Sequence, residues 1–557
     1  MGARQLGADW QQRYGYEPVL LETFVEHKRF AGTSYRAANW QYLGLTKGRG
    51  KKDVKHEHKG SVKAVYVYPL RKDFRERLGG KEGLWEAPPK LSWAEQEFES
   101  IELGDERRHK RLHRLSCDFY AHPEANIPQA CGSVAATKGA YRFFAHKEVS
   151  MAKIVEAHSE ATLERCREKA VILAVQDTTV LNYSGHEQAE DLGEIGTRVG
   201  KTKGMIVHDT MAFDTEGLAL GLLDVQSWIR DLKKPKKGQR KKRPIEEKES
   251  YKWLCSYDAV VQAQKQDPRK LWVSVGDREA DIYELFAHAQ KQGEEGPKLL
   301  VRATHNRILR EEQQKLWESM HKEQVAGTLE VQVPRKPREK KRRANLQIRH
   351  KELLLHEPSK GKETVRVWGP VYAHENNSPK GSTALSWMLL TTVPVNSFAE
   401  AVERVRWYTI RWQIEVYHKV LKSGCRTEDR QLKSRQQLEA CLALDMVVAW
   451  RIFYLTHRSR HEPQKPCSVN FEEHEWKALY FFVNRTNQVP QKAPPLRQAV
   501  RMVAQLGGFL GRKCDGEPGP KTLWRGLQRL KDIANCYKMI TSGELSANSN
   551  QLTYGAG

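Results

Sequence analysis

The sequence lacks the features that mark membrane, secreted and zinc-ribbon proteins. No apolar run reaches the length of a membrane span, and the closest, at 441–455, is interrupted by Asp445 and Arg451. The nine cysteines include no CxxC pair and are odd in number, which excludes a disulfide framework or a zinc ribbon built on them. The N-terminus lacks the apolar segment of a signal peptide. We therefore expect a soluble cytoplasmic protein with no membrane partner, in which 441–455 forms a buried helix.

Acidic residues are too few to balance the basic ones. Asp and Glu total 69 against 93 Lys and Arg, which gives a formal net charge of +24 at pH 7. Such an excess favours a polyanionic partner, and nucleic acid is a better candidate than an acidic membrane surface. The 557 residues exceed one ordinary hydrophobic core, so several domains are expected.

Changes in residue pattern divide the chain into segments. Gly and Pro punctuate 79–90, after a first segment of short β-like runs, and a helical pattern follows from 92 to 168. Strand-length apolar runs then alternate with helical stretches, including a hairpin at 204–228, and β-like runs fill 300–395. A helix begins after Asn396 or Ser397, and helices predominate to the end. The pattern predicts a mixed α/β fold with an inserted sheet, divided at 1–85, 90–168, 169–300, 301–395, 396–430 and 431–557.

One basic and aromatic stretch, YTIRWQIEVYHKVLKSGCR at 408–426, contains a conspicuous carboxylate. On a regular helix, which advances about 100° per residue, its Tyr408, Arg411, Glu415 and Lys422 fall within roughly 60° of one another. Such a face offers a carboxylate to a hard divalent cation, and two cations and a phenol to phosphate oxygens. The alternative is an ordinary surface helix with charge pairs.

Two further carboxylates follow apolar strands. Asp177 directly follows the run AVILAVQ, and Asp277 directly follows LWVSVG. Each is therefore expected at the end of a strand, where ligands of α/β sheets collect. Each could instead cap the next turn or pair with a neighbour such as Arg278. Together with Glu415, they form a set of oxygen ligands that two Mg²⁺ ions could share.

These residues resemble those of a known family. The DTT at Asp177, the GDREAD at Asp277 and the spacing of Tyr408, Arg411, Glu415 and Lys422 are similar to the DDE triad and the Y-R-E-K signature of IS-four family transposases of the Tn-five type. The resemblance extends from about 92 to 540 and includes LGDERRHKRL, KGAYRFF, EKESYKWL, LSWMLLTTVPV and LGGFLGRKCDGEPGPKTLWRGLQRL.

The resemblance implies a fold and a reaction. The expected fold is an RNase H-like catalytic core interrupted by a β-rich insertion, with a helical domain on the N-terminal side that binds transposon ends and a helical dimerisation domain on the C-terminal side. Asp177, Asp277 and Glu415 would hold two Mg²⁺ ions, with Mn²⁺ as a substitute. One ion would activate water and then the freed 3′-OH, and the other would stabilise the leaving oxygen. A homodimer in the bacterial cytoplasm, at the nucleoid, would nick terminal inverted repeats, form and resolve hairpins, and join the ends to target DNA.

The resemblance also implies DNA contacts. Tyr408, Arg411 and Lys422 would clamp backbone phosphates, and Trp387 matches the aromatic residue on which a flipped base stacks, although a core tryptophan is the alternative. The end-recognition helices would contribute Arg107, Arg108, Lys110, Arg111, Tyr141 and Arg142. The basic runs at 233–244 and 335–343 are either phosphate contacts or solvated hairpin loops.

The first 85 residues have a different resemblance, to part of the DruA-like domain of unknown function. Their loop at Gly48, Arg49 and Gly50 could cradle a phosphate or be a flexible basic turn. Two rival functions stay open for the whole chain. One is a non-catalytic or domesticated DNA-binding protein, and the other is a metal-dependent nuclease without strand transfer.

Overall fold

The chain is described from a computed structural model, apart from isolated positions, over residues 18–46, 61–71, 92–186, 191–195, 202–230, 243–333, 342–356, 364–368, 370–376 and 384–541. It divides into two units, Met1–Ser92 and Trp93–Gly557. Each unit has its own core.

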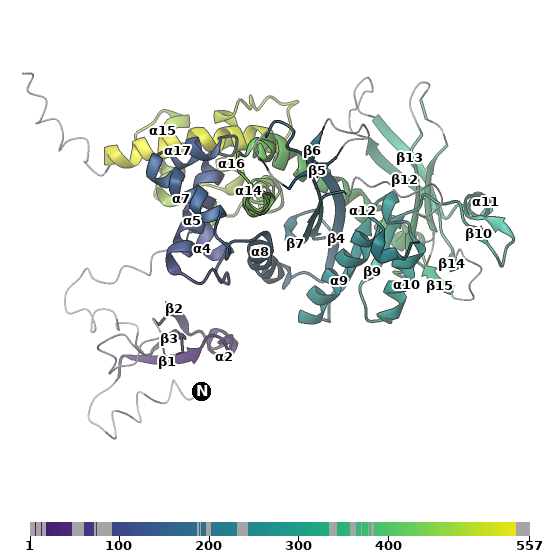
Figure 1. Cartoon of the computed structure of the whole chain (residues 1–557), viewed down its shortest axis with the longest axis horizontal. Helices are drawn as coiled ribbons and strands as arrows, with labels where there is room; N and C mark the ends of the chain where they lie inside the picture. Colours follow the sequence, from purple (N-terminus) through teal and green to yellow (C-terminus); the bar gives the residue numbers. More distant parts are fainter. Residues whose placement is uncertain are drawn as a thin grey trace, which may run out of the picture. The chain divides into compact units, whose positions relative to one another are not determined.

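The first unit contains a small antiparallel sheet and one short helix (Figure 1). The strand order is β1-β3-β2, and the elements are β1 (Leu20–Glu26), α2 (Thr33–Ala37), β2 (Gln41–Leu45) and β3 (Lys63–Pro69). Val25, Ala64 and Tyr66 are buried between these elements, and the Tyr66 ring stacks on Tyr35 at 5.7 Å.

The second unit is built on a mixed ten-stranded sheet, which agrees with the mixed α/β prediction. At its centre, β4 and β9 both run parallel to β8, while β6 and β7 form an antiparallel hairpin beside β4, as predicted for 204–228. The sequences of these strands contain apolar runs, which are typical of a sheet covered on both faces. The strands are β4 (Val171–Asn182), β5 (Gly193–Glu194), β6 (Lys203–Phe213), β7 (Ala219–Trp228), β8 (Leu271–Gly276) and β9 (Lys298–Arg302).

The β-rich segment after β9 extends the same sheet. Its last strand, β17, pairs antiparallel with β9, and β16, β13 and β12 follow outward in that order. Two small hairpins, β10-β11 and β14-β15, stand apart from the sheet. The strands are β10 (Ile308–Leu309), β11 (Gln314–Lys315), β12 (Gly327–Val333), β13 (Arg342–Arg349), β14 (Glu352–His356), β15 (Thr364–Trp368), β16 (Pro370–Glu375) and β17 (Ser386–Thr391).

Helices precede and follow the sheet along the chain. Those before β4 are α4 (Trp93–Glu97), α5 (Glu106–Ala121), α6 (Ile127–Cys131), α7 (Val134–Phe144) and α8 (Met151–Cys166). Asp105, Ser133 and Ser150 cap α5, α7 and α8 through their side-chain oxygens. Within the sheet region lie α9 (Tyr251–Gln266), α10 (Tyr283–Lys291) and α11 (Leu316–Lys322). The last are α14 (Arg435–His461), α15 (Glu473–Asn484), α16 (Leu496–Leu506) and α17 (Pro520–Thr541).

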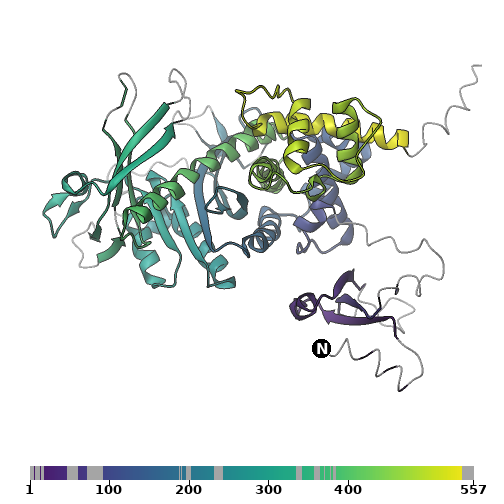
Figure 2. The ribbon, with the colours of Figure 1, turned by 180° about the vertical axis from the view of Figure 1, so that it is seen from behind.

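The long helix α14 is buried on nearly all sides, which confirms the prediction for 441–455. Other helices lie around it (Figures 1 and 2), and α8, α16 and α17 contact it. Its two charged interruptions have partners. Asp445 forms an ion pair of 2.7 Å with the buried Arg430, and the Arg451 guanidinium lies 4.4 Å from the centre of the Trp93 ring. No helix in the described ranges is long and apolar enough to cross a membrane.

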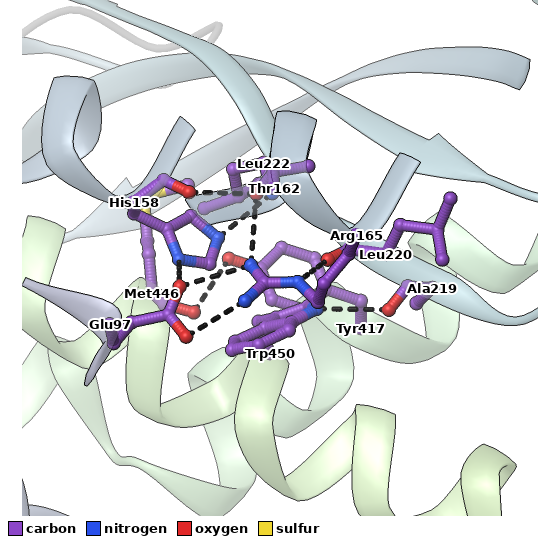
Figure 3. A network of polar contacts seen from close by, with 10 residues as sticks. All are labelled: Glu97, His158, Thr162, Arg165, Ala219, Leu220, Leu222, Tyr417, Met446 and Trp450. Carbon is purple, nitrogen blue, oxygen red and sulfur yellow. Dashed lines mark hydrogen bonds and ion pairs between the residues drawn. The ribbon is translucent and has the colours of Figure 1, made fainter. Parts of the chain in front are cut away.

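A buried polar network joins α4 to α8, β7 and α14 (Figure 3). Arg165 donates to both Glu97 oxygens at 3.0 Å and to the Leu220 carbonyl, while its guanidinium lies 4.2 Å from the Trp450 ring. His158 Nε2 accepts the Leu222 backbone N–H at 2.9 Å, so this imidazole is neutral and its Nδ1–H donates to Glu97. Buried hydrogen bonds therefore connect the early helices to the sheet at this point.

Candidate active site

Asp177 lies within β4, which continues to Asn182, so the prediction that it ends its strand was wrong; Asp277 directly follows β8, as predicted. The β4 and β8 strands pair residues whose numbers differ by 100, and Val175 beside Val275 is the last pair. Asp177 follows this last pair by two residues within β4, and Asp277 follows it by two residues just beyond β8, so both lie where the paired stretch of the two strands ends. Asp277 Oδ1 also accepts the Glu279 backbone N–H at 2.8 Å, which is the turn-capping contact considered as the alternative for this residue.

Glu415 is connected to Asp177 through Arg411. It lies on α13 (Trp412–Lys419), a helix held to the core by the buried Ile414 and Tyr417. Arg411 Nη2 lies 2.5 Å from Glu415 Oε1, and Arg411 Nη1 lies 3.9 Å from Asp177 Oδ2. One guanidinium thus faces two carboxylates that are 238 positions apart in the sequence.

The negative charge of the buried Asp177 carboxylate is only partly balanced by nearby cations. Burial raises its pKa to about 6, although the nearby charges of His418 and Arg411 act to lower it. Desolvation therefore outweighs these cations. An additional cation beside Asp177 would be stabilised by this carboxylate and would lower its pKa.

Two aromatic rings and an arginine lie on the Asp277 side of the site. Tyr408 on α12 (Phe398–Ile410) is buried, and its ring centre is 6.3 Å from that of the half-buried Trp387. Burial raises the pKa of Tyr408; Arg411 and Arg302 act to lower it, and Asp277 acts to raise it. Arg302 Nη2 donates to the Ser386 carbonyl at 3.0 Å. Sequence reasoning missed Arg302, although its place at the end of the apolar run KLLVR was a usable signal.

Lys422 lies in a less regular part of the helix than the spacing predicted. The chain breaks the α-helical pattern at Arg411, between α12 and α13, and residues 420–424 form a wider π turn. The expectation of one regular helix across the four residues was therefore wrong. Lys422 Nζ donates to the Val180 carbonyl of β4 at 2.7 Å, whereas Arg411 and Glu415 remain paired as i, i+4 neighbours.

Two residues that sequence reasoning missed adjoin Asp177. His418 on α13 and Asp209 on β6 are buried, and His418 Nε2 lies 2.7 Å from Asp209 Oδ1. The other ring nitrogen, Nδ1, lies 3.8 Å from Asp177 Oδ2. The usable signal was the acid in the apolar strand GMIVHDTMAF, whose position opposite Asp177 depends on the hairpin register.

The donors suit a hard divalent cation, although they are not gathered around one point. Among the described residues, no three His, Cys, Asp or Glu side chains converge as a metal site. Asp177, Asp277 and Glu415 nevertheless supply carboxylate oxygens from adjoining elements, which are the ligands that Mg²⁺ and Mn²⁺ prefer. The Arg411 guanidinium lies between two of them, and the incomplete compensation of Asp177 fits a site that takes additional positive charge.

The residues of the early helices that are expected to contact DNA differ in exposure and in their contacts within the protein. Arg107, Lys110 and Arg142 are exposed, whereas Arg111 and Tyr141 are half-buried. Arg108 is partly used within the protein, because its Nε donates to the Leu103 carbonyl at 2.6 Å and its Nη1 lies 3.0 Å from His146. The loop at Gly48 to Gly50 and most of the basic runs at 233–244 and 335–343 lie outside the described residues.

Three protein-family models match parts of the chain. A transposase DNA-binding model matches residues 90–149, which contain α4 to α7, and a transposase Tn5 dimerisation domain model matches residues 447–543, which contain most of α14 and all of α15 to α17. A model for the Druantia protein DruA matches residues 1–56. The chain therefore matches a Tn5-type transposase that carries a DruA-like segment at its N-terminus.

Proposed function

We propose that the protein is a cut-and-paste DNA transposase in which Asp177, Asp277 and Glu415 form one catalytic centre for phosphoryl transfer. The observation that carries the proposal is the placement of the three carboxylates on adjoining elements. Asp177 and Asp277 lie where the paired stretch of β4 and β8 ends, and Arg411 faces both Asp177 and Glu415. The family matches on both sides of this centre supply the complementary functions, DNA binding and dimerisation.

The order of the central strands supports an RNase H-like core. Across the sheet the order is β7-β6-β4-β8-β9. If the short β5 is left out and these strands are numbered along the chain from β4, the spatial order is 3-2-1-4-5. The first three are antiparallel and the last two are parallel to the first. Asp177 and Asp277 lie where the pairing of the two central parallel strands ends, and the β-rich insertion enters after the fifth strand.

The three carboxylates would hold two Mg²⁺ ions, with Mn²⁺ as a substitute. When bound, the ions would supply Lewis acidity and a nucleophile at neutral pH. The chain's own contribution is to fix the carboxylates on rigid elements. Without bound ions, Arg411 neutralises the charges of Asp177 and Glu415. Once bound cations neutralise these carboxylates, the Arg411 guanidinium can bind a DNA phosphate.

The surrounding residues would position DNA. Tyr408 lies near Asp277 and Arg302 lies near Tyr408, and both can bind phosphate oxygens. Trp387 presents a half-buried ring on which an unstacked base could rest. Lys422 still has two further N–H donors for a phosphate beyond the one given to Val180. Arg107 and Lys110 can reach the DNA end, since their side chains are 90% and 73% exposed, and their partners Asp105 and Glu106 are acids on the same surface.

Strand cleavage on a gel tests this proposal. Purified protein, Mg²⁺ and a DNA fragment with the inverted repeats that flank its own gene are compared for wild type, Glu415→Ala and the control Glu403→Ala, an exposed acid on α12. We expect nicks and end hairpins from wild type and the control, and DNA binding without cutting from Glu415→Ala. Hydrolysis without joining to target DNA would favour the nuclease, and binding without cutting by wild type would favour the non-catalytic DNA-binding protein.

A further inference from the structure

A run of buried polar residues lies in the middle of β6. His208, Asp209 and Thr210 are each 0% exposed, although the strand around them is apolar. Burying a carboxylate costs several kcal/mol unless it is paired and hydrogen-bonded. Asp209 Oδ2 forms no hydrogen bond with any part of the chain that the structure describes, so hydrogen bonding leaves this carboxylate incompletely satisfied. A purely structural position would be better filled by an apolar residue.

Asp209 lies directly opposite Asp177. The antiparallel pairing of β4 and β6 matches these two residues, so their side chains project from the same face of the sheet. His418 comes from α13 and lies between them, with Nε2 at 2.7 Å from Asp209 and Nδ1 at 3.8 Å from Asp177. The imidazole is therefore flanked by a carboxylate on each side.

This arrangement limits how Asp177 can turn. The hydrogen bond that His418 Nε2–H donates to Asp209 fixes the orientation of the planar ring, and the fixed ring directs Nδ1 toward Asp177 Oδ2. The same oxygen is approached by Arg411 at 3.9 Å. Asp277 is restrained by a turn N–H, and Glu415 is restrained by the Arg411 guanidinium, which it shares with Asp177.

We propose that Asp209 and His418 are positioning residues that orient the Asp177 carboxylate for cation binding and for DNA cleavage. This inference rests on the proposed function. Neither residue has to touch DNA: His418 acts through Asp177, and Asp209 acts through His418. Partners that orient a ligand in this way typically change metal affinity or activity 10- to 100-fold when they are removed.

The test compares Asp209→Asn with Asp177→Asn and with a matched control. Asp214→Asn is the control, because Asp214 is a buried acid of the same hairpin, where it caps the turn to Leu218 and pairs with Lys169. Binding of Mn²⁺ alone is measured by electron paramagnetic resonance of the free ion. Cleavage of the inverted-repeat fragment is measured at saturating DNA, and DNA affinity is measured separately.

We expect Asp209→Asn to weaken Mn²⁺ binding and to slow cleavage by about 10- to 100-fold, with DNA affinity within about twofold of wild type. His418→Gln provides a second variant, because its amide can still reach Asp209 but does not present a nitrogen to Asp177; the same loss is expected. Wild-type Mn²⁺ affinity and cleavage in both variants would overturn the inference. If wild type itself neither binds Mn²⁺ nor cuts, the proposed function fails, and the inference falls with it.

Discussion

The ion pair that anchors α4 provides a quantitative prediction. Glu97 is 5% exposed; burial acts to raise its pKa, but Arg165 and His158 outweigh burial and lower the pKa from 4.5 to about 2. At about 1.36 kcal/mol per pKa unit, this shift corresponds to about 3 kcal/mol of folding free energy when Glu97 is ionised. Because the folded pKa lies below the unfolded one, the contribution is present above pH 4.5 and is lost as the pH falls through 2.

Urea unfolding of wild type and Glu97→Gln at several pH values measures this contribution. We expect the variant to be less stable by about 3 kcal/mol at pH 7, and the difference to shrink by about half at pH 3. Glu164→Gln is the control, because Glu164 pairs with Arg167 on the surface, where both side chains are more than 60% exposed; its effect should stay below about 1 kcal/mol. A difference for Glu97→Gln that does not change with pH would refute the electrostatic reasoning.

Three further predictions concern DNA and metal. Trp387→Ala should leave the first nick intact but reduce hairpin formation, because stacking on an aromatic ring is worth about 1–3 kcal/mol per base. A denaturing gel separates the nicked product from the hairpin product, and equal loss of both would contradict a stacking role. Joint substitution of Arg107 and Lys110 by Ala should weaken binding of the inverted-repeat DNA and reduce the salt slope by about 2, measured by fluorescence anisotropy at several salt concentrations. An unchanged slope would place the phosphate contacts elsewhere. Removal of divalent ions with a chelator should abolish cutting but not binding, and added Mn²⁺ should restore cutting; cutting that persists in the chelator would exclude the proposed centre.

The local parts of the site could be predicted from the sequence. The i, i+4 pairing of Arg411 with Glu415 follows from helical periodicity, and Ser397 caps α12 as one of the two predicted candidates. The apolar runs before Asp177 and Asp277 form neighbouring strands. In each case the pattern lies within one element, where spacing determines geometry. The roles of these residues in catalysis stay predictions.

The parts that depend on contacts distant in sequence could not be predicted. The opposition of Asp209 to Asp177 requires the register of a hairpin, and the contact with His418 requires the docking of a helix more than 200 residues later. The π turn that contains Lys422 departs from regular helical spacing, so periodicity alone does not predict its contact with Val180. Similarly, the continuation of the central sheet into the insertion depends on the pairing of β17 with β9, which no local pattern specifies.

The most direct test of the three-carboxylate centre is to locate Mn²⁺ by anomalous X-ray scattering in crystals of the protein bound to its inverted-repeat DNA. The account predicts anomalous peaks within coordination distance of Asp177, Asp277 and Glu415, about 2.0–2.3 Å from their oxygens. Crystals of Glu415→Ala should lose or weaken a peak. Mn²⁺ bound elsewhere, with these three carboxylates still paired only to Arg411 and their protein neighbours in the DNA complex, would contradict the account.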